Sequence, residues 1–174
     1  MHLAQAVRLL EKGEPLFEST TNWADLGCGS GLFTQALAQL LPTGSVIHAV
    51  DTDQKALGHL PQPEGIQLIP HAFNFTREIW PFDALDGVLM ANSLHYVADK
   101  RAFIQQIQPY LQTTHLLIII EYEREKPNPW VPYPITYPQL SSLLQALGYS
   151  KTHKLGEHPS RYGNGHMYAA MALR

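Results

Sequence analysis

The chain has 174 residues, of which 45% are hydrophobic and 16% charged, and its net charge is −3 at pH 7. We expect one globular domain that stands without disulfides, and the absence of a lysine or arginine run disfavours a nucleic-acid partner. The single cysteine, Cys28, and nine scattered histidines show no metal-ligand spacing, so we expect no metal site. No stretch resembles a signal peptide or a membrane span, which predicts a cytoplasmic protein without membrane contact.

The first 21 residues are interpreted as an N-terminal cap segment before a core that spans residues 22–174. Residues 2–12 carry apolar side chains at helical spacing, which predicts a short amphipathic helix. Gly13 and Pro15 end this helix, and a loop leads into the first strand. The cap segment is too short to be separate, so we expect a single domain over the whole chain.

A glycine-rich turn follows the first predicted strand, residues 23–26. Gly27, Gly29 and Gly31 occupy alternate positions, and a helical pattern begins directly afterwards at Phe33. A strand, glycine loop and helix let the backbone approach a ligand closely, because glycine has no Cβ and tolerates positive φ. The helix start adds unpaired N–H groups and a positive dipole end, which favour an anionic group.

The spacing of these glycines separates two cofactor classes. A dinucleotide-binding turn follows G-x-G-x-x-G/A, whereas here the third small position holds Leu32. Asp25, two residues before the first glycine, would repel a pyrophosphate and attract an ammonium group. These residues resemble the first motif, D-x-G-x-G-x-G, of the class I S-adenosylmethionine-dependent methyltransferases. The plainer alternative is a structural glycine turn in another α/β protein.

The resemblance covers residues 20–173 and implies an α/β fold, a single Rossmann-like methyltransferase domain. It implies a seven-stranded, mostly parallel sheet with an antiparallel C-terminal hairpin and helices on both faces. It also implies S-adenosyl-L-methionine as methyl donor, S-adenosyl-L-homocysteine as product and a small-molecule acceptor. In the glycine loop, the expected cofactor-binding residues are Asp25, Gly27, Cys28, Gly29 and Gly31.

Further cofactor contacts are expected after the second and third strands. Residues 45–50 predict a buried strand that ends at Asp51, where a carboxylate accepts hydrogen bonds from the ribose hydroxyls. Thr52 follows in the same site, and Asp53 is better explained as the N-cap of the next helix.

The third strand is expected over residues 66–70 and leads to the adenine contact. Ala72 stands where many family members have an acidic residue that receives the adenine amino group. Adenine could still be held by the backbone N–H of Phe73, or by Asn74 instead.

The fourth strand, residues 85–90, precedes the stretch 91–96, which reads A-N-S-L-H-Y. This stretch resembles the N-x-L-H-H sequence of small-molecule methyltransferases of the class. We therefore expect Ala91 and Asn92 beside the reactive methyl, at the carboxyl ends of the strands. His95 is a candidate general base, because histidine side chains titrate near neutral pH. The alternative, which the sequence favours, is that His95 orients this loop or packs below it.

A continuous apolar run over residues 116–120 predicts a central parallel strand. Glu121 and Tyr122 follow it and are further catalytic candidates. The loop over residues 121–137 is rich in proline and aromatic residues, and a substrate lid and a plain surface loop are equal alternatives.

Residues 138–147 predict a helix, and residues 149–155 and 166–173 predict two strands without a crossover helix between them, which must be antiparallel. This hairpin argues against an NAD(P)-dependent oxidoreductase, whose last strand runs parallel. Departures from the family pattern at Ala72 and at residues 112–114 keep a non-catalytic or partner-dependent S-adenosylmethionine-binding protein as an alternative. The acceptor is not defined by the sequence, and both a monomer and a homodimer are compatible with it.

Overall fold

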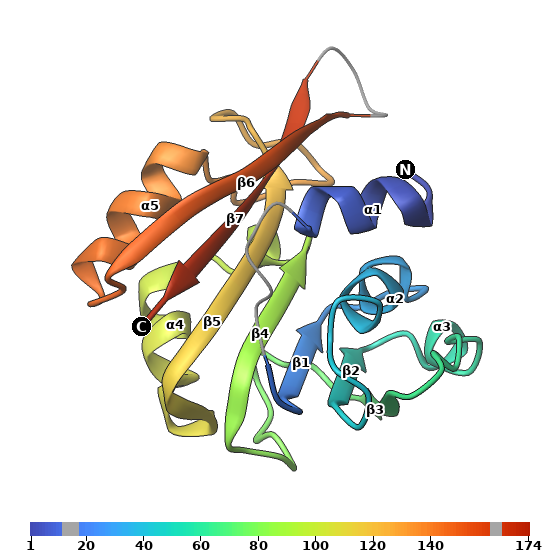
Figure 1. Ribbon diagram of the computed structural model, residues 1–174. Coiled ribbons are helices and arrows are strands. Elements are labelled where there is room, and N and C mark those ends of the chain that lie inside the picture. The colour runs from blue at the N-terminus through green and yellow to red at the C-terminus, as the bar shows by residue number, and fades with distance from the viewer. Residues whose placement is uncertain (12–17, 161–164) are drawn as a thin grey trace.

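The computed structural model describes residues 1–11, 18–160 and 165–174 of the chain (Figure 1). The helices are α1 (Leu3–Leu10), α2 (Leu32–Ala38), α3 (Gln54–Leu57), α4 (Lys100–Gln106) and α5 (Tyr137–Ala146), with short 3₁₀ helices η1 (Leu94–Tyr96) and η2 (Gln108–Tyr110). The strands are β1 (Asn22–Leu26), β2 (Val46–Asp51), β3 (Gln67–Ala72), β4 (Leu85–Ala91), β5 (Leu111–Tyr122), β6 (Lys151–Pro159) and β7 (His166–Leu173).

In this part of the chain, seven strands form one sheet in the order β3-β2-β1-β4-β5-β7-β6 (Figure 1). The pairs among β3, β2, β1, β4 and β5 are parallel, whereas β7 runs antiparallel to both β5 and β6. The predicted antiparallel C-terminal hairpin and the predicted fold class are therefore confirmed.

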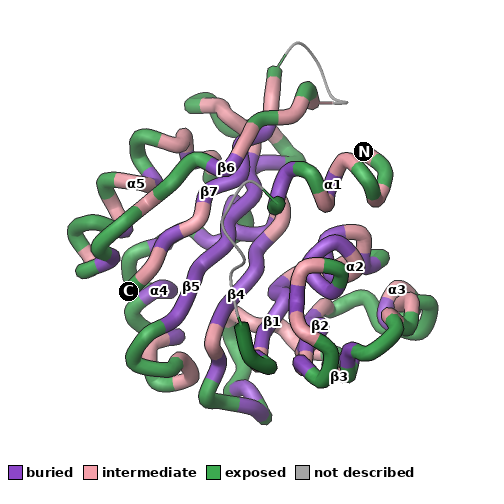
Figure 2. Tube along the Cα trace, in the orientation of Figure 1, coloured by how far each residue is buried: buried purple, intermediate pink, exposed green. Residues whose placement is uncertain are grey.

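Side chains alternate between the two faces of the sheet along each strand. Both faces carry apolar side chains, and helices cover both. On one face, Trp23 and Ile118 pack in an apolar cluster with side chains of α1 and α2. On the other face, Ala24 and Leu117 belong to a second cluster, which includes side chains of α4 and α5. Figure 2 shows the central strands as the most buried part of the chain. The sheet interior thus fixes the strand ends on which the site is built.

Side-chain caps begin α3, α4 and α5. The Asp53 carboxylate accepts hydrogen bonds from two N–H groups of α3, as predicted, and the Asp99 carboxylate accepts one from Ala102 in α4. At α5, Thr136 and Gln139 form a reciprocal capping box, which satisfies two backbone donors.

Several element boundaries differ from the sequence-based expectation. The strand β5 extends over 12 residues, so Glu121 and Tyr122 belong to it and residues 112–114 are strand, not turn. At its carboxyl end β5 keeps pairing with β7 as far as the pair Tyr122–Met167, and at its amino end Leu111 pairs with Leu85 of β4. Likewise β3 runs to Ala72 because it keeps pairing with β2. The predicted helix end at Gly13 lies outside the described residues.

Candidate active site at the carboxyl ends of the strands

Backbone hydrogen bonds hold the glycine loop between β1 and α2 against the end of β2. Gly27, Gly29 and Gly31 have φ values of +79°, +52° and +81°, which favour glycine. The N–H groups of Gly27 and Cys28 both donate to the Val50 carbonyl oxygen, at 2.8 and 3.0 Å. A Cβ at Gly27 would lie 2.6 Å from the Ser93 side chain, whereas one at Gly29 would meet no protein atom within 4 Å. The loop is therefore tight at Gly27 and open at Gly29.

Asp51 connects this loop to the end of β2. Its Oδ2 accepts a hydrogen bond from the Gly29 N–H at 2.8 Å, and its Oδ1 accepts one from the Asp53 N–H at 2.9 Å. Each carboxylate oxygen retains a lone pair for a further donor. Asp51 and the exposed Thr52 next to it both line a cavity, so the structure places these two predicted residues together.

Asp25 lies on β1 beneath the loop and is 1% exposed. Its Oδ2 accepts a short hydrogen bond, 2.6 Å, from the Thr34 hydroxyl of α2, while its Oδ1 is buried with no partner. Burial raises the pKa of Asp25 to about 7, with Asp51 adding to the increase and the Thr34 hydrogen bond opposing it. A buried acceptor without a donor is costly, so this oxygen is an unusual feature of the site.

The first cavity has a volume of about 420 Å³. It is lined by Gly27, Asp51, Thr52, Asn74, Phe75, Thr76, Arg77, Asn92, Ser93 and Tyr96. Neither Ala72 nor Phe73 lines it, because the Phe73 ring turns toward His71 and Phe82. Sequence reasoning missed the contribution of residues 75–77, which carry no motif and reach the cavity because the chain turns back after β3.

Asn92 stands at the end of β4 and lines both this cavity and a second one. Its φ of +56° is unusual for a residue other than glycine, and its Oδ1 is buried without a hydrogen-bond partner. The Asn92 N–H donates to the Ile120 carbonyl oxygen at 2.8 Å, which keeps the residue in register with β5. A strained residue with an unpaired buried oxygen is typical of a binding site. Ala91, its neighbour, lines neither cavity.

His95 and Glu121 form a buried pair between η1 and the end of β5. Glu121 Oε2 lies 2.7 Å from His95 Nδ1, and Oε1 accepts the His95 backbone N–H at 2.9 Å. Their side chains are 3% and 1% exposed. His95 lines the second cavity, whereas Glu121 does not, because both of its oxygens are directed to His95.

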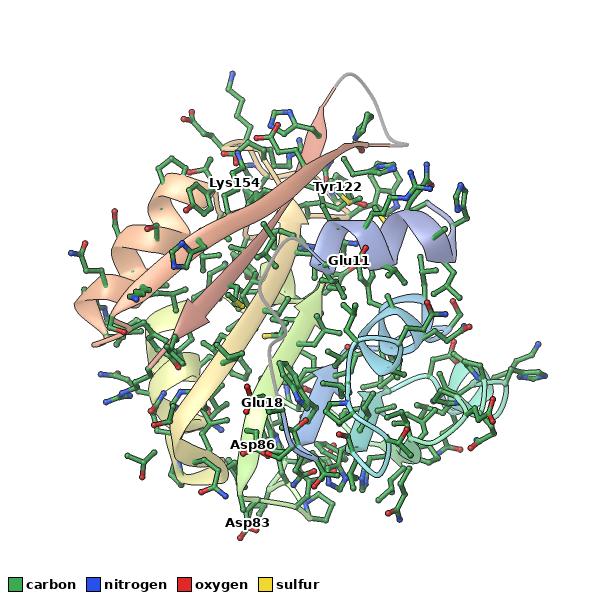
Figure 3. All side chains as sticks on the ribbon, viewed as in Figure 1. Glu11, Glu18, Asp83, Asp86, Tyr122 and Lys154 are labelled. Carbon is green, nitrogen blue, oxygen red and sulfur yellow. The ribbon has the colours of Figure 1, made fainter. Side chains whose placement is uncertain are left out.

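The second cavity, of about 610 Å³, lies beside the first and shares Asn92 and Tyr96 with it. It is lined by Asn92, His95, Tyr96, Tyr122, Arg124, Asn128, Trp130 and Val131. Figure 3 labels Tyr122 at the carboxyl end of β5. The proline-rich loop after β5 thus forms one wall of this cavity.

That loop is fixed to η1 by hydrogen bonds. The Tyr133 N–H donates to the His95 carbonyl oxygen at 3.0 Å, and the Lys100 ammonium donates to the carbonyl oxygens of Tyr133 and Val97 at 2.7 and 2.9 Å. Lys100 is buried, and burial lowers its pKa. These bonds hold the loop against the residues that carry His95.

Residues 24–114, more than half of the chain, match the family model described as a methyltransferase domain. The chain belongs to this family. The resemblance to the class I methyltransferases is therefore confirmed, and the oxidoreductase alternative is set aside. No curated protein matches the sequence.

Solved structures share the fold of this methyltransferase domain. A S-adenosylmethionine-dependent methyltransferase from Aquifex aeolicus is 14% identical, with a TM-score of 0.65 over 95% of this chain and 86% of that chain. The plantazolicin methyltransferase BpumL, in complex with S-adenosylhomocysteine, is 12% identical, with a TM-score of 0.66 over 98% and 82%. Magnesium protoporphyrin IX methyltransferase from Synechocystis PCC 6803, with bound S-adenosylmethionine, is 18% identical, with a TM-score of 0.65 over 98% and 76%.

The described part of the domain shows neither a membrane-spanning helix nor a cluster of metal-ligating side chains. None of its helices there has the length and apolar character needed to cross a membrane. Nor do three or more His, Cys, Asp or Glu side chains gather there in a way that could hold a metal ion.

Proposed function

We propose that this domain is a S-adenosylmethionine-dependent methyltransferase that acts on a small-molecule acceptor. The observation that carries this proposal is the meeting of two cavities at the carboxyl ends of the parallel strands, where Asn92 and Tyr96 line both. With the methyl donor in the first cavity and the acceptor in the second, the reacting atoms would meet at this junction. Alignment of two reactants in this way is the main contribution an enzyme makes to such a displacement.

The first cavity and the glycine loop, which reaches it at Gly27, fit the methyl donor, although Asp25, Cys28, Gly29 and Gly31 are not among the residues that line the cavity. The Asp51 carboxylate would accept the ribose hydroxyls, and the open face of Gly29 would admit the methionine part. Asp25 Oδ1 and Asn92 Oδ1 are buried acceptors without partners, which suits the ammonium group. Cys28 and Gly31 complete the loop, and burial raises the pKa of the Cys28 thiol, which stays neutral.

Adenine would lie near the end of β3. Asn74 and Phe75 line the cavity there and are the stronger candidates for holding the base. Ala72 and Phe73 remain predicted contacts that their backbone groups alone could make. The aromatic face of Phe75 would stack against the base, and Asn74 would supply the polar contact that an acidic residue makes in many family members.

When bound, S-adenosylmethionine supplies a methyl group that its sulfonium activates for nucleophilic attack. The residues of the second cavity would orient the acceptor, exclude water and accept a proton where the acceptor loses one. Two proteins with this fold are named as methyltransferases of plantazolicin and of magnesium protoporphyrin IX, which supports an acceptor other than nucleic acid.

Calorimetric titration with S-adenosylmethionine, S-adenosylhomocysteine and NAD(H) tests the proposal. We expect both sulfur ligands to bind and NAD(H) to give no heat. Failure of both sulfur ligands to bind would contradict the proposal. Binding of both without turnover on any acceptor would instead support the non-catalytic alternative.

A further inference from the structure

We propose that the second cavity takes a planar aromatic hydroxyl compound that also carries a carboxylate, and that His95, positioned by Glu121, accepts the hydroxyl proton. The inference rests on the proposed function and specifies its acceptor. Its elements are three aromatic side chains, one arginine and one histidine, which line the same cavity, and a buried glutamate that is hydrogen-bonded to the histidine.

The aromatic side chains define the shape of the acceptor. Tyr96, Tyr122 and Trp130 line the cavity, and Tyr96 and Trp130 are 59% and 75% exposed. Large aromatic surfaces left in water at the mouth of a cavity gain the most when a flat apolar ligand covers them. The volume of about 610 Å³ lies in the range of small-molecule sites. We therefore infer a ligand with an aromatic ring.

Arg124 defines the charge of the acceptor. It is the residue with a permanent charge among those that line the cavity. Its Nε donates to the Lys126 carbonyl oxygen at 2.8 Å, and no described carboxylate lies within ion-pair distance of its guanidinium. The two terminal nitrogens can thus form the paired hydrogen bonds that arginine makes with a carboxylate.

The His95–Glu121 pair defines the reacting group. Because the Glu121 carboxylate accepts a hydrogen bond from Nδ1, the proton of a neutral His95 resides on Nδ1 and Nε2 carries the lone pair. Nε2 has no hydrogen bond to any described residue, and His95 lines the cavity. A hydroxyl proton can therefore move to Nε2, and the buried Glu121 carboxylate stabilises the imidazolium that forms.

The reaction balances in the following way. The acceptor oxygen forms a bond to the methyl carbon with one of its electron pairs, and the carbon–sulfur bond breaks with its pair left on sulfur. The hydroxyl proton goes to His95 Nε2 and from there to solvent. The products are the methyl ether, S-adenosylhomocysteine and one proton, so no oxidant, reductant or metal is required.

Two chromophoric probes test the acceptor without turnover. 4-Hydroxy-3-nitrobenzoate carries the carboxylate, and 2-nitrophenol has the same chromophore without it. With saturating S-adenosylhomocysteine, we expect the carboxylate probe to bind at least tenfold more tightly than 2-nitrophenol. Its phenolate absorption band should appear at a lower pH when bound than in free solution, because His95 takes the proton.

Variants assign these two effects to separate residues. Arg124→Gln should remove the tenfold preference, whereas Lys126→Gln removes a charge from the same loop outside the cavity and should leave it intact. His95→Gln should keep the preference, which shows that the cavity is folded, but return the phenolate band toward its pH in free solution. Glu121→Gln should shift the band in the same direction, because Glu121 acts through His95.

Equal binding of the two probes, or an unchanged preference in Arg124→Gln, would overturn the acceptor class. A phenolate band that His95→Gln does not move would overturn the role of His95. Failure of the proposed function is a different result, since calorimetry with S-adenosylhomocysteine alone, without either probe, would then give no binding.

Discussion

The two cavities differ in the parts of the chain that line them: the first includes the glycine turn and the end of β2, and the second includes η1 and the loop after β5. At the first, the glycine loop and the end of β2 are joined by the Gly29–Asp51 hydrogen bond. At the second, His95 is paired with Glu121, 26 residues further on, and a loop after β5 supplies Arg124 and Trp130.

This difference explains what each cavity can recognise. The backbone of the glycine loop and the side-chain carboxylate at the end of β2 are fixed by the sheet, which suits one invariant ligand. Side chains on a loop can change without disturbing the sheet, so we expect them to set the acceptor of an individual protein. Substitutions at each cavity test whether the two recognise their ligands separately.

Gly29→Val should abolish binding of S-adenosylmethionine, because a branched Cβ would fill the open face of the loop. The control is Gly148→Val, since Gly148 also has positive φ, +88°, with no atom nearer than 4.0 Å to a Cβ, and lies at the end of α5. The backbone strain of about 1–2 kcal/mol is common to both variants. Calorimetry should therefore show loss only for Gly29→Val, and unchanged affinity in that variant would contradict the role of the loop.

Asp51→Ala should weaken S-adenosylmethionine binding by about 1.5–3 kcal/mol, or roughly 10- to 150-fold, from the loss of a charged hydrogen-bond partner. The matched control is Asp53→Ala, which removes the α3 cap and should cost about 1 kcal/mol of stability with little effect on affinity. Similar affinity losses in the two variants would refute a specific ribose contact for Asp51.

Asp25→Asn should weaken cofactor binding and at the same time stabilise the free protein above pH 7. The unfolded carboxyl titrates near 3.8 and the folded one at about 7, so the folded state holds its proton longer. The stability present below pH 4 is therefore lost as pH rises to about 7, by on the order of 4 kcal/mol. Chemical unfolding of both proteins at pH 8 measures the gain, and a less stable Asp25→Asn variant would contradict it.

The free energy of unfolding should also depend on pH below 6.5, because of the histidine pair His48 and His71. Their ring nitrogens are 2.9 Å apart between β2 and β3. Burial, together with His71, lowers the pKa of His48 to about 4. Stability is then lost as pH falls from about 6.5 through 4, opposite in sign to the effect of Asp25. His71 and His115, with pKa values lowered by burial, act in the same direction as His48.

Between pH 4 and 6.5 the slope from Asp25 should offset part of the opposite slope from the three histidines in the wild type. In Asp25→Asn the slope of the histidines should remain alone, and adding His48→Phe should reduce it. Unfolding curves across this range provide the measurement. A slope in Asp25→Asn that the second substitution does not reduce would exclude His48 as a source.

The smallest effect is expected from Lys100→Gln, which weakens the attachment of the loop to η1. Deuterium exchange at the Val131 and Tyr133 amides should become several times faster, because Lys100 donates to the Tyr133 and Val97 carbonyl oxygens. Affinity for S-adenosylmethionine should stay within twofold of the wild type. A larger change in affinity would show that the two cavities are energetically coupled.

The features that depend on local chemistry could be predicted from the sequence. The glycine spacing, Asp25 and the carboxylate after the second strand identified the family, and the absence of a crossover helix predicted the antiparallel β7. These features can be recognised because each depends on residues close in the chain: positive φ requires glycine, and a short connection forces antiparallel pairing.

The assembly of the second cavity could not be predicted from the sequence, because it depends on tertiary contacts. No residue near His95 in the sequence indicates that Glu121 forms a hydrogen bond with it. The two meet because the parallel strands β4 and β5 end side by side. The same holds for Asn92, whose unpaired oxygen and place at the junction of two cavities follow from the packing of β4 against its neighbours. Side-chain contacts between distant residues depend on register and on the path of loops, which local patterns do not encode.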